Sequence, residues 1–168
     1  MEHRIERIGP GGWERMREVR LAQLLDTPMA FMETYETALG HGEDEWRARV
    51  ERVSAAGSVG FAAVAPDGRW VGTMISFTPV PDEALLVGVW VDPAYRGRGL
   101  GVTDGLLDAV LDWAREEAGA HRLLLRVHED NPRATAFYRR RGFALTGESE
   151  PYELDPTGLL LEMALPLD

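Results

Sequence analysis

The chain contains no cysteine and no lysine, and each absence excludes a class of chemistry. Without cysteine there is no disulfide framework, no thiolate metal site and no cysteine nucleophile. Without lysine there is no Walker-type phosphate loop and no Schiff-base mechanism, because both need an amine. All 18 strongly basic side chains are therefore arginines.

Long apolar runs and a surplus of positive charge are also missing. No segment approaches the roughly 20 apolar residues of a membrane-spanning helix, and the charged stretch Met1–Arg7 has no apolar run behind it. We therefore expect a cytoplasmic protein without a membrane partner. The net charge of −10 repels polyanions, so we expect no nucleic-acid partner.

What is present is enough apolar material for a core. The 168 residues are 45% hydrophobic, and a domain of this length buries roughly 70% of the surface of its unfolded chain. No repeat and no low-complexity linker divides the sequence. We expect a single domain over residues 1–168.

The first third of the chain predicts one strand and two helices. Arg4–Ile8 alternates apolar and polar residues as an edge strand does. Trp13–Leu25 and Asp44–Val53 carry apolar residues at helical spacing. The segment Met29–Gly42 between them fits neither pattern clearly.

The remainder predicts strands around one long helix. Phe61–Ala65 and Trp70–Phe77 flank an Asp-Gly turn as a β-hairpin does. Ala84–Val91 is an apolar run typical of a strand buried on both faces. An amphipathic helix over Gly99–Ala118 precedes the strand Leu123–Val127. A strand, a helix and a strand in succession imply a parallel crossover pair.

A second helix and two strands close the chain. Asn131 and the following proline form a helix start, and Gly142 suits the left-handed position at its end. Phe143–Leu145 and Leu159–Leu165 are predicted strands. The predicted fold is α+β in three layers (α/β/α), with a mixed and mainly antiparallel central sheet.

The most informative stretch is the glycine-dense turn after the buried strand. Gly97, Gly99 and Gly101 let the backbone approach a ligand closely. The first N–H groups of the following helix have no internal partners and lie at the positive end of its dipole. These features predict an anion site, for which phosphate is the usual ligand. The spacing misses the dinucleotide fingerprint, because Val102 stands where glycine or alanine is needed.

Two motifs in this order resemble the GNAT family of N-acetyltransferases. Arg96–Gly101 fits the R/Q-x-x-G-x-G/A signature, and Asn131–Phe143 fits the element N-x-x-A-x-x-F/L-Y-x-x-x-G-F. The resemblance runs from about Ser58 to the C-terminus. It implies the GNAT acyl-CoA N-acyltransferase fold with a splayed parallel pair, a cofactor-binding core over 58–168 and substrate-side helices over 1–57.

The resemblance implies acetyl-CoA as co-substrate and no metal. Its pyrophosphate is expected on the amides of the turn, and its pantetheine arm on the backbone of Val89 and Val91. Gly88 is compatible with the bulge that such splaying needs. The expected cofactor-binding residues are Val89, Trp90, Val91, Arg96, Gly97, Arg98, Gly99, Leu100, Gly101, Val102, Asn131 and Tyr138.

In the family, the tyrosine that stands at Tyr138 donates a proton to the departing thiolate, so Tyr138 is the expected general acid. The general base is less determined, because the interior of the buried strand has no acid. Glu83 is the predicted catalytic base, and Asp82, Glu33, Glu36, His128 or a water chain to backbone carbonyls are alternatives.

The acceptor is expected to be a small-molecule amine or a peptide N-terminus, bound by Phe31, Glu33, Tyr35 and His128. One hypothesis is an acidic approach for a cationic acceptor, and the other is an apolar pocket. The acidic set is Glu33, Glu36, Glu43, Asp44, Glu45, Glu148, Glu150, Glu153 and Asp155. The apolar set is Trp13, Phe31, Met32, Tyr35 and Tyr152.

Three alternatives stay open at this level. A non-catalytic acyl-CoA-binding module would keep the anion turn without the chemistry. Another acyl-CoA could replace acetyl-CoA as the donor. Exposed strand edges make a homodimer a further hypothesis.

Overall fold

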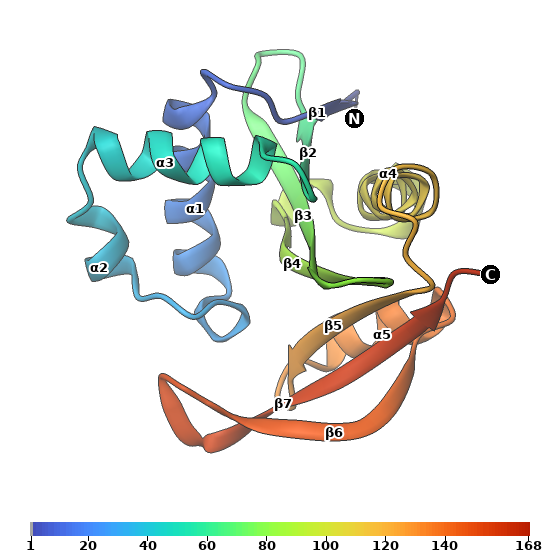
Figure 1. The fold of residues 1–168 in the computed structure, drawn as a ribbon. Coiled ribbons are helices and arrows are strands. Elements are labelled where there is room, and N and C mark those ends of the chain that lie inside the picture. The colour runs from blue at the N-terminus through green and yellow to red at the C-terminus, as the bar shows by residue number, and fades with distance from the viewer. Residues whose placement is uncertain (1) are drawn as a thin grey trace.

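A computed structural model describes residues 2–168, in which a seven-stranded sheet carries helices on both faces (Figure 1). The strand order is β1-β2-β3-β4-β5-β7-β6. The strands are β1 (Arg4–Arg7), β2 (Ser58–Val64), β3 (Trp70–Val80), β4 (Glu83–Val91), β5 (Arg122–His128), β6 (Ala144–Tyr152) and β7 (Asp155–Pro166). The α-helices are α1 (Trp13–Asp26), α2 (Tyr35–Leu39), α3 (Glu43–Ser54), α4 (Val102–Glu116) and α5 (Pro132–Arg140), and the 3₁₀ turns are η1 (Pro28–Ala30), η2 (Pro93–Tyr95) and η3 (Arg98–Leu100).

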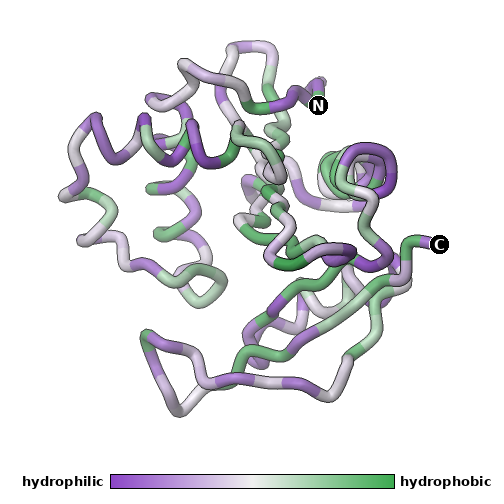
Figure 2. The backbone as a smooth tube through the Cα atoms, viewed as in Figure 1, coloured by the Kyte–Doolittle hydropathy of each residue, from purple (hydrophilic) through white to green (hydrophobic). Residues whose placement is uncertain are grey.

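The helices form two layers that cover opposite faces of the sheet. On one face, α1 and α3 bury a cluster that includes Val19, Trp46 and Val50. On the other face, α4 turns its apolar side to the sheet (Figure 2) and fully buries Leu106 and Val110. Burial of each such side chain stabilises the fold by roughly 1.5–3 kcal/mol. The three-layer α+β prediction is confirmed.

Strands β4 and β5 form the only parallel pair of the sheet over residues 2–168. Their pairing runs from Glu83 opposite Arg122 to Leu86 opposite Leu125 and then stops. Beyond Leu86 the two strands diverge, so the predicted splayed pair is present. Their C-terminal ends leave room for a ligand between them.

A bulge at Gly88 bends β4 where the divergence begins. The register with β3 shifts between the pairs Thr73–Trp90 and Ile75–Val87. Gly88 has a φ of 60°, a conformation that disfavours residues with a Cβ, and a Cβ there would lie 3.1 Å from Ile75 Cδ1. The bulge expected at Gly88 is therefore confirmed, and glycine is needed for it.

Two parts of the secondary-structure prediction differ from the structure. The long helix begins at Val102 and not at Gly99, because a 3₁₀ turn over Arg98–Leu100 precedes it. The strand predicted over Phe143–Leu145 extends as β6 to Tyr152. β6 is polar and exposed because it forms an edge of the sheet, so it lacks the alternation that identifies a half-buried strand.

Candidate active site

A cleft of about 690 Å³ lies at the divergent ends of β4 and β5. Its walls are β4 from Leu85 onward, β5 from Leu125 to His128, helix α5 and the segment around η1. The glycine-dense turn after β4 closes one end. The fold therefore brings the two sequence motifs, which lie about one helix and one strand apart in the chain, to one site.

The backbone of β4 offers main-chain groups to this cleft. Asp92 N–H donates to the Val71 carbonyl of β3 at 2.8 Å, and Trp90 stands opposite Thr73. In an antiparallel ladder alternate residues bond to the partner strand. The N–H groups of Val89 and Val91 consequently point away from β3, toward the gap left by β5.

The turn presents backbone N–H groups without partners among residues 2–168; the exception within Gly97–Val102 is Leu100, whose N–H donates to the Gly97 carbonyl oxygen at 3.2 Å. Gly97 and Gly101 have φ values of 112° and 69°, which glycine adopts readily. Helix α4 starts at Val102 with no side-chain cap on its first N–H groups. A Cβ on Gly97, Gly99 or Gly101 would meet nothing within 4 Å. This open space beside unbonded amides suits an anion.

Arg96 ties the end of β4 to helix α1. Its Nε donates to the Val91 carbonyl oxygen at 2.8 Å, and its Nη2 donates to the Asp26 carboxylate. The Trp90 indole donates to the same carboxylate at 2.9 Å. Burial raises the pKa of Asp26, but hydrogen bonds from Thr27, Arg96 and Trp90 outweigh burial and lower it. Trp90 thus lines the cleft with its indole anchored among the helices.

Tyr138 of α5 lines the cleft and is 5% exposed. Its ring packs edge-to-face against Phe137 and Phe143, with both pairs of ring centroids 5.5 Å apart. Its hydroxyl makes no hydrogen bond to any of residues 2–168. Burial raises the pKa of Tyr138 above its ordinary value, so the phenol stays protonated at neutral pH. Phe137 also borders the cleft and is the less buried of the two rings.

Asn131 caps α5 and also borders the cleft. Its Oδ1 accepts from the Ala134 N–H at 3.3 Å, as the helix-start pattern predicts. At the other end of the helix, Arg140 donates to Asp104 of α4 at 3.1 Å. Burial raises the pKa of Asp104, but hydrogen bonds from Arg140 and Arg141 lower it overall. These contacts fix the distance between the turn and α5.

Glu83, the predicted base, lies outside the cleft. It begins β4 where β4 and β5 are still paired, and its carboxylate binds Arg122 Nη2 at 3.0 Å. The cleft opens at the other end of the strand. This placement removes Glu83 from the candidates, and the exposed Asp82 beside it does not line the cleft either.

His128 lines the cleft, and its Nδ1 is already occupied as a hydrogen-bond acceptor. The Asp130 N–H donates to His128 Nδ1 at 3.1 Å, so the neutral ring carries its proton on Nε2. The ring stacks edge-to-face on Tyr152, whose hydroxyl donates to the Phe31 carbonyl oxygen at 2.6 Å. In the neutral form Nε2 therefore carries the N–H, and this atom lies close to Gly158, where a Cβ would come within 2.7 Å of it.

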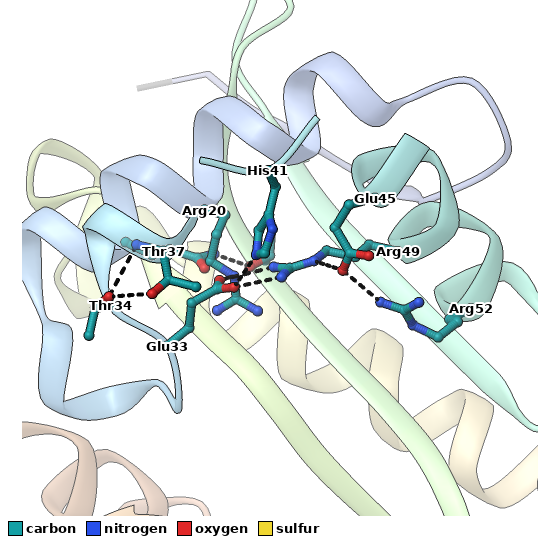
Figure 3. Close-up of polar contacts among 10 residues, drawn as sticks. Arg20, Glu33, Thr34, Thr37, His41, Glu45, Arg49 and Arg52 are labelled. Carbon is teal, nitrogen blue, oxygen red and sulfur yellow. Dashed lines mark hydrogen bonds and ion pairs between the residues drawn. The ribbon is translucent and has the colours of Figure 1, made fainter. Parts of the chain in front are cut away.

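Glu33 is held in a polar cluster beneath helices α1 and α3 (Figure 3). Arg49 donates to both of its oxygens, at 2.9 and 2.6 Å, and His41 Nε2 lies 3.1 Å away. The hydrogen bond from Arg49 is the main reason why the pKa of Glu33 is lowered. Glu33 and Tyr35, both predicted to bind the acceptor, lie outside the cleft lining, whereas Phe31 is part of it.

The acidic approach predicted for a cationic acceptor is not formed. Of the nine acids in that set, only Glu150 lines the cleft, and Arg126 Nε lies 3.4 Å from it. Glu43 and Glu45 pair with arginines of their own helix. The cleft is lined by six arginines against two acids: Arg20, Arg96, Arg98, Arg126, Arg133 and Arg140 against Asp104 and Glu150.

Two residues behind the site were missed by the sequence analysis. Gln23 of α1 is 3% exposed, and its Nε2 donates to Thr73 Oγ1 at 2.8 Å. Thr73 in turn donates to the Gly88 carbonyl oxygen at 2.8 Å. A buried glutamine needs a buried hydrogen-bond partner. The position of Gln23 on the apolar side of the predicted helix was therefore the one sequence feature that could have indicated this contact.

Among residues 2–168, no group of three or more histidine and acidic side chains is placed to hold a metal ion. None of the helices in this part of the chain is long and apolar enough to cross a membrane.

The sequence profile described as "Acetyltransferase (GNAT) family" matches residues 18–143. The chain therefore belongs to the GNAT acetyltransferase family.

Solved structures agree with this fold over nearly the whole chain. A GNAT-family acetyltransferase from Streptococcus pneumoniae superposes with a TM-score of 0.81 at 17% identity, covering 99% of this chain and 100% of that one. The yncA protein of Salmonella typhimurium, solved with its cofactor acetyl-CoA, gives 0.78 at 20% identity and covers 100% and 95%.

Curated relatives match in part. Streptothricin acetyltransferase of Streptomyces lavendulae is 36% identical over 88 residues, covering 52% of this chain and 45% of the relative. N-alpha-acetyltransferase RimI of Mycobacterium tuberculosis is 38% identical over 94 residues, covering 56% and 50%. The matched segment thus spans half or less of the length of these relatives.

Proposed function

We propose that this protein transfers an acetyl group from acetyl-CoA to a primary amine by direct attack in a ternary complex. The observation that carries the proposal is the set of unbonded amides in the turn Gly97–Val102, all but that of Leu100, beside the gap between β4 and β5. The turn offers N–H groups to an anion, and the gap between β4 and β5 offers the backbone of β4 to an added strand. A cofactor with a diphosphate and an amide-bearing arm needs both.

The residues present fit acetyl-CoA. The turn amides from Gly97 to Val102 would bind the pyrophosphate without any lysine, and each hydrogen bond to a charged group contributes roughly 1.5–3 kcal/mol. The cleft-facing backbone of Val89 and Val91 would pair with the amides of the pantetheine arm, as an added strand does. Arg98 and Arg133 line the same cleft and add positive charge.

Two groups of the chain carry the chemistry in this proposal. The Val91 N–H polarises the thioester carbonyl and stabilises the negative charge that develops on its oxygen. The amine nitrogen forms a bond to the thioester carbonyl carbon, and the bond between that carbon and the sulfur breaks. Tyr138 gives its proton to the departing sulfur, and solvent restores it. Because the pKa of Tyr138 is raised, this transfer has to be coupled to the bond breaking.

No side chain of the predicted set is placed as a general base. Glu33 is bound by Arg49, Glu83 is bound by Arg122, and His128 Nδ1 already accepts from the Asp130 N–H. We therefore favour removal of the amine proton through water molecules that backbone carbonyls hold in place, with the proton passing to bulk solvent. For an alkylamine of pKa near 10.4, exposing the lone pair at pH 7 costs about 4.6 kcal/mol.

The names of the curated relatives support an amine acceptor. One acetylates streptothricin by name, and the other is named an N-alpha-acetyltransferase. A small-molecule amine or a peptide N-terminus is accordingly the proposed acceptor class. Succinyl-CoA or another acyl-CoA remains the alternative donor to compare.

A non-catalytic acyl-CoA-binding protein is the second candidate. It is favoured by the interior of β4, which contains no acid, and by the pairing of Glu33. Such a protein would bind acetyl-CoA and release no coenzyme A when amines are added.

Calorimetric titration with acetyl-CoA and an amine-dependent assay for free thiol test the proposal together. In the Gly99→Ala variant a methyl group occupies the open space beside the turn amides, so acetyl-CoA should bind at least about tenfold more weakly. Gly42→Ala, at a helix start with equally open surroundings, is the matched control and should bind normally. Unchanged affinity in Gly99→Ala would refute the anion site.

A further inference from the structure

Arg20 of α1 presents a partly buried guanidinium to the cleft, and this group has no hydrogen-bond partner among residues 2–168. Its closest ionic contact is Nε to Glu33 Oε1 at 3.6 Å, which is beyond hydrogen-bond distance. Its five N–H donors find no acceptor among residues 2–168. The side chain is 23% exposed, borders the cleft and lies over the Phe31 ring, 4.9 Å from its centroid.

Glu33, the carboxylate that contacts Arg20, is already bound by other cations. Glu33 accepts two hydrogen bonds from Arg49 and one contact from His41, as Figure 3 shows. Burial lowers the pKa of Arg20, while Glu33 raises it and Arg49 lowers it. Arg49 and His41 thus contact Glu33 at hydrogen-bond distance, whereas Arg20 does not. A partly buried guanidinium that faces a cleft can bind an anion through two parallel hydrogen bonds if the anion carries two oxygens, as a carboxylate does.

The position of Arg20 along the cleft follows from its neighbours on α1. Asp26 contacts Trp90, beside the anion turn, and Gln23 reaches Gly88 through a threonine hydroxyl. Arg20 lies three residues further back, about 4.5 Å along the helix axis. It therefore lies beyond Gly88, on the side of the bulge away from the turn. The acceptor must enter on this side, because the cofactor site occupies the other.

We propose that the acceptor amine also carries a carboxylate, and that Arg20 binds this carboxylate in a bidentate pair. The assignment rests on the proposed N-acetyltransferase function. Phe31 and the exposed Met32, both in the lining, would contact the apolar part of such an amino acid. The lining of the cleft contains two acids, Asp104 and Glu150, and both contact arginines, so it disfavours a polycation as the acceptor.

Matched pairs of acceptors test the assignment on the unaltered protein. L-Leucine, L-phenylalanine, β-alanine and 4-aminobutyrate are compared with their carboxamides in the free-thiol assay. At least one carboxylate should give a kcat/KM about tenfold or more above that of its amide. Equal rates within threefold for every pair would overturn the assignment.

Variants then locate the preference. Arg20→Gln should lower kcat/KM for the preferred carboxylate by about tenfold to hundredfold, the range for hydrogen bonds to a charged group, and leave the amide within threefold. Arg20→Lys keeps the positive charge but loses the two parallel N–H donors of the guanidinium. Its kcat/KM for the carboxylate should therefore lie between those of the parent and of Arg20→Gln. Arg52→Gln, an exposed arginine of α3, is the matched control. The unfolding midpoint of each variant reports whether it is folded.

The two levels of the proposal fail differently. If acetyl-CoA binds neither the unaltered protein nor the control, the N-acetyltransferase function is wrong and this inference falls with it. If acetyl-CoA binds and amines are acetylated, but Arg20→Gln keeps the carboxylate preference, the function stands and the role of Arg20 is refuted.

Discussion

Thr73 donates its hydroxyl to the carbonyl oxygen of Gly88, 2.8 Å away, and so joins β3 to the bulge of β4. The same hydroxyl accepts from Gln23 at 2.8 Å, which links helix α1 to the strand. Both side chains are almost fully buried. The bend that separates β4 from β5 is therefore held by a hydrogen-bonded chain inside the protein.

Thr73→Val should destabilise the fold by about 1–3 kcal/mol, because it leaves the buried Gln23 amide and the Gly88 carbonyl unpaired. Urea unfolding followed by circular dichroism measures this change. Thr78→Val is the control, since its hydroxyl makes a long 3.4 Å bond in an exposed position; it should shift stability by less than about 0.5 kcal/mol. Equal losses of stability in both variants would show that the hydrogen bonds joining Gln23, Thr73 and Gly88 do not stabilise the fold.

Tyr138→Phe should lower kcat by about 100-fold or more, as loss of a general acid does, while the dissociation constant for acetyl-CoA stays within threefold. Calorimetry and the free-thiol assay separate the two quantities. Tyr35→Phe, outside the cleft, should change neither. A Tyr138→Phe enzyme of normal kcat would remove the proposed acid, and a protein with no turnover to lose would favour the binding-module alternative.

The pH profile should rise across the alkaline range. If water removes the amine proton, log kcat/KM should rise with a slope near one from pH 7 toward the pKa of the acceptor. No falling limb is expected below pH 10, because burial raises the pKa of Tyr138 and keeps the acid protonated. Steady-state rates between pH 6 and 10 provide the measurement. A plateau beginning near pH 7 would instead indicate a side-chain base.

Glu33→Gln should destabilise the protein by about 1–3 kcal/mol at pH 7, because Arg49 and His41 lose the carboxylate that they contact. The pKa of Glu33 is lowered in the folded state, so its stabilising contribution is present above the ordinary glutamate pKa of about 4.3 and is lost as the pH falls further. Denaturant unfolding at pH 7 and pH 3.5 should therefore show the gap between variant and parent shrinking. Glu43→Gln, in an exposed pair, serves as the comparison; a gap that widens at low pH would contradict the prediction.

Local features of the site could be predicted from the sequence. The turn, the cap at Asn131 and the glycine at position 88 depend on backbone conformations that neighbouring residues determine. The family resemblance added the expected role of Tyr138, which the structure places in the cleft.

Long-range pairing could not be predicted in the same way. Glu83 looked like a base because its strand leads to the turn, but its register opposite Arg122 sets it at the closed end of the pair. Glu33 meets Arg49 only when α3 comes against the segment that follows η1, and the resulting ion pair neutralises the Glu33 charge. Such contacts depend on how distant elements meet, which spacing within one segment does not encode.

The early end of the β4–β5 ladder has a consequence for how ligand occupancy could be observed. If the cofactor arm fills the gap, the amide protons of Val89 and Val91 pass from solvent contact into a continuous ladder. Their exchange with deuterium should then slow in the complex, while amides between Glu83 and Leu86, already paired, keep their rates. The sheet itself would serve as a residue-level reporter of the bound state.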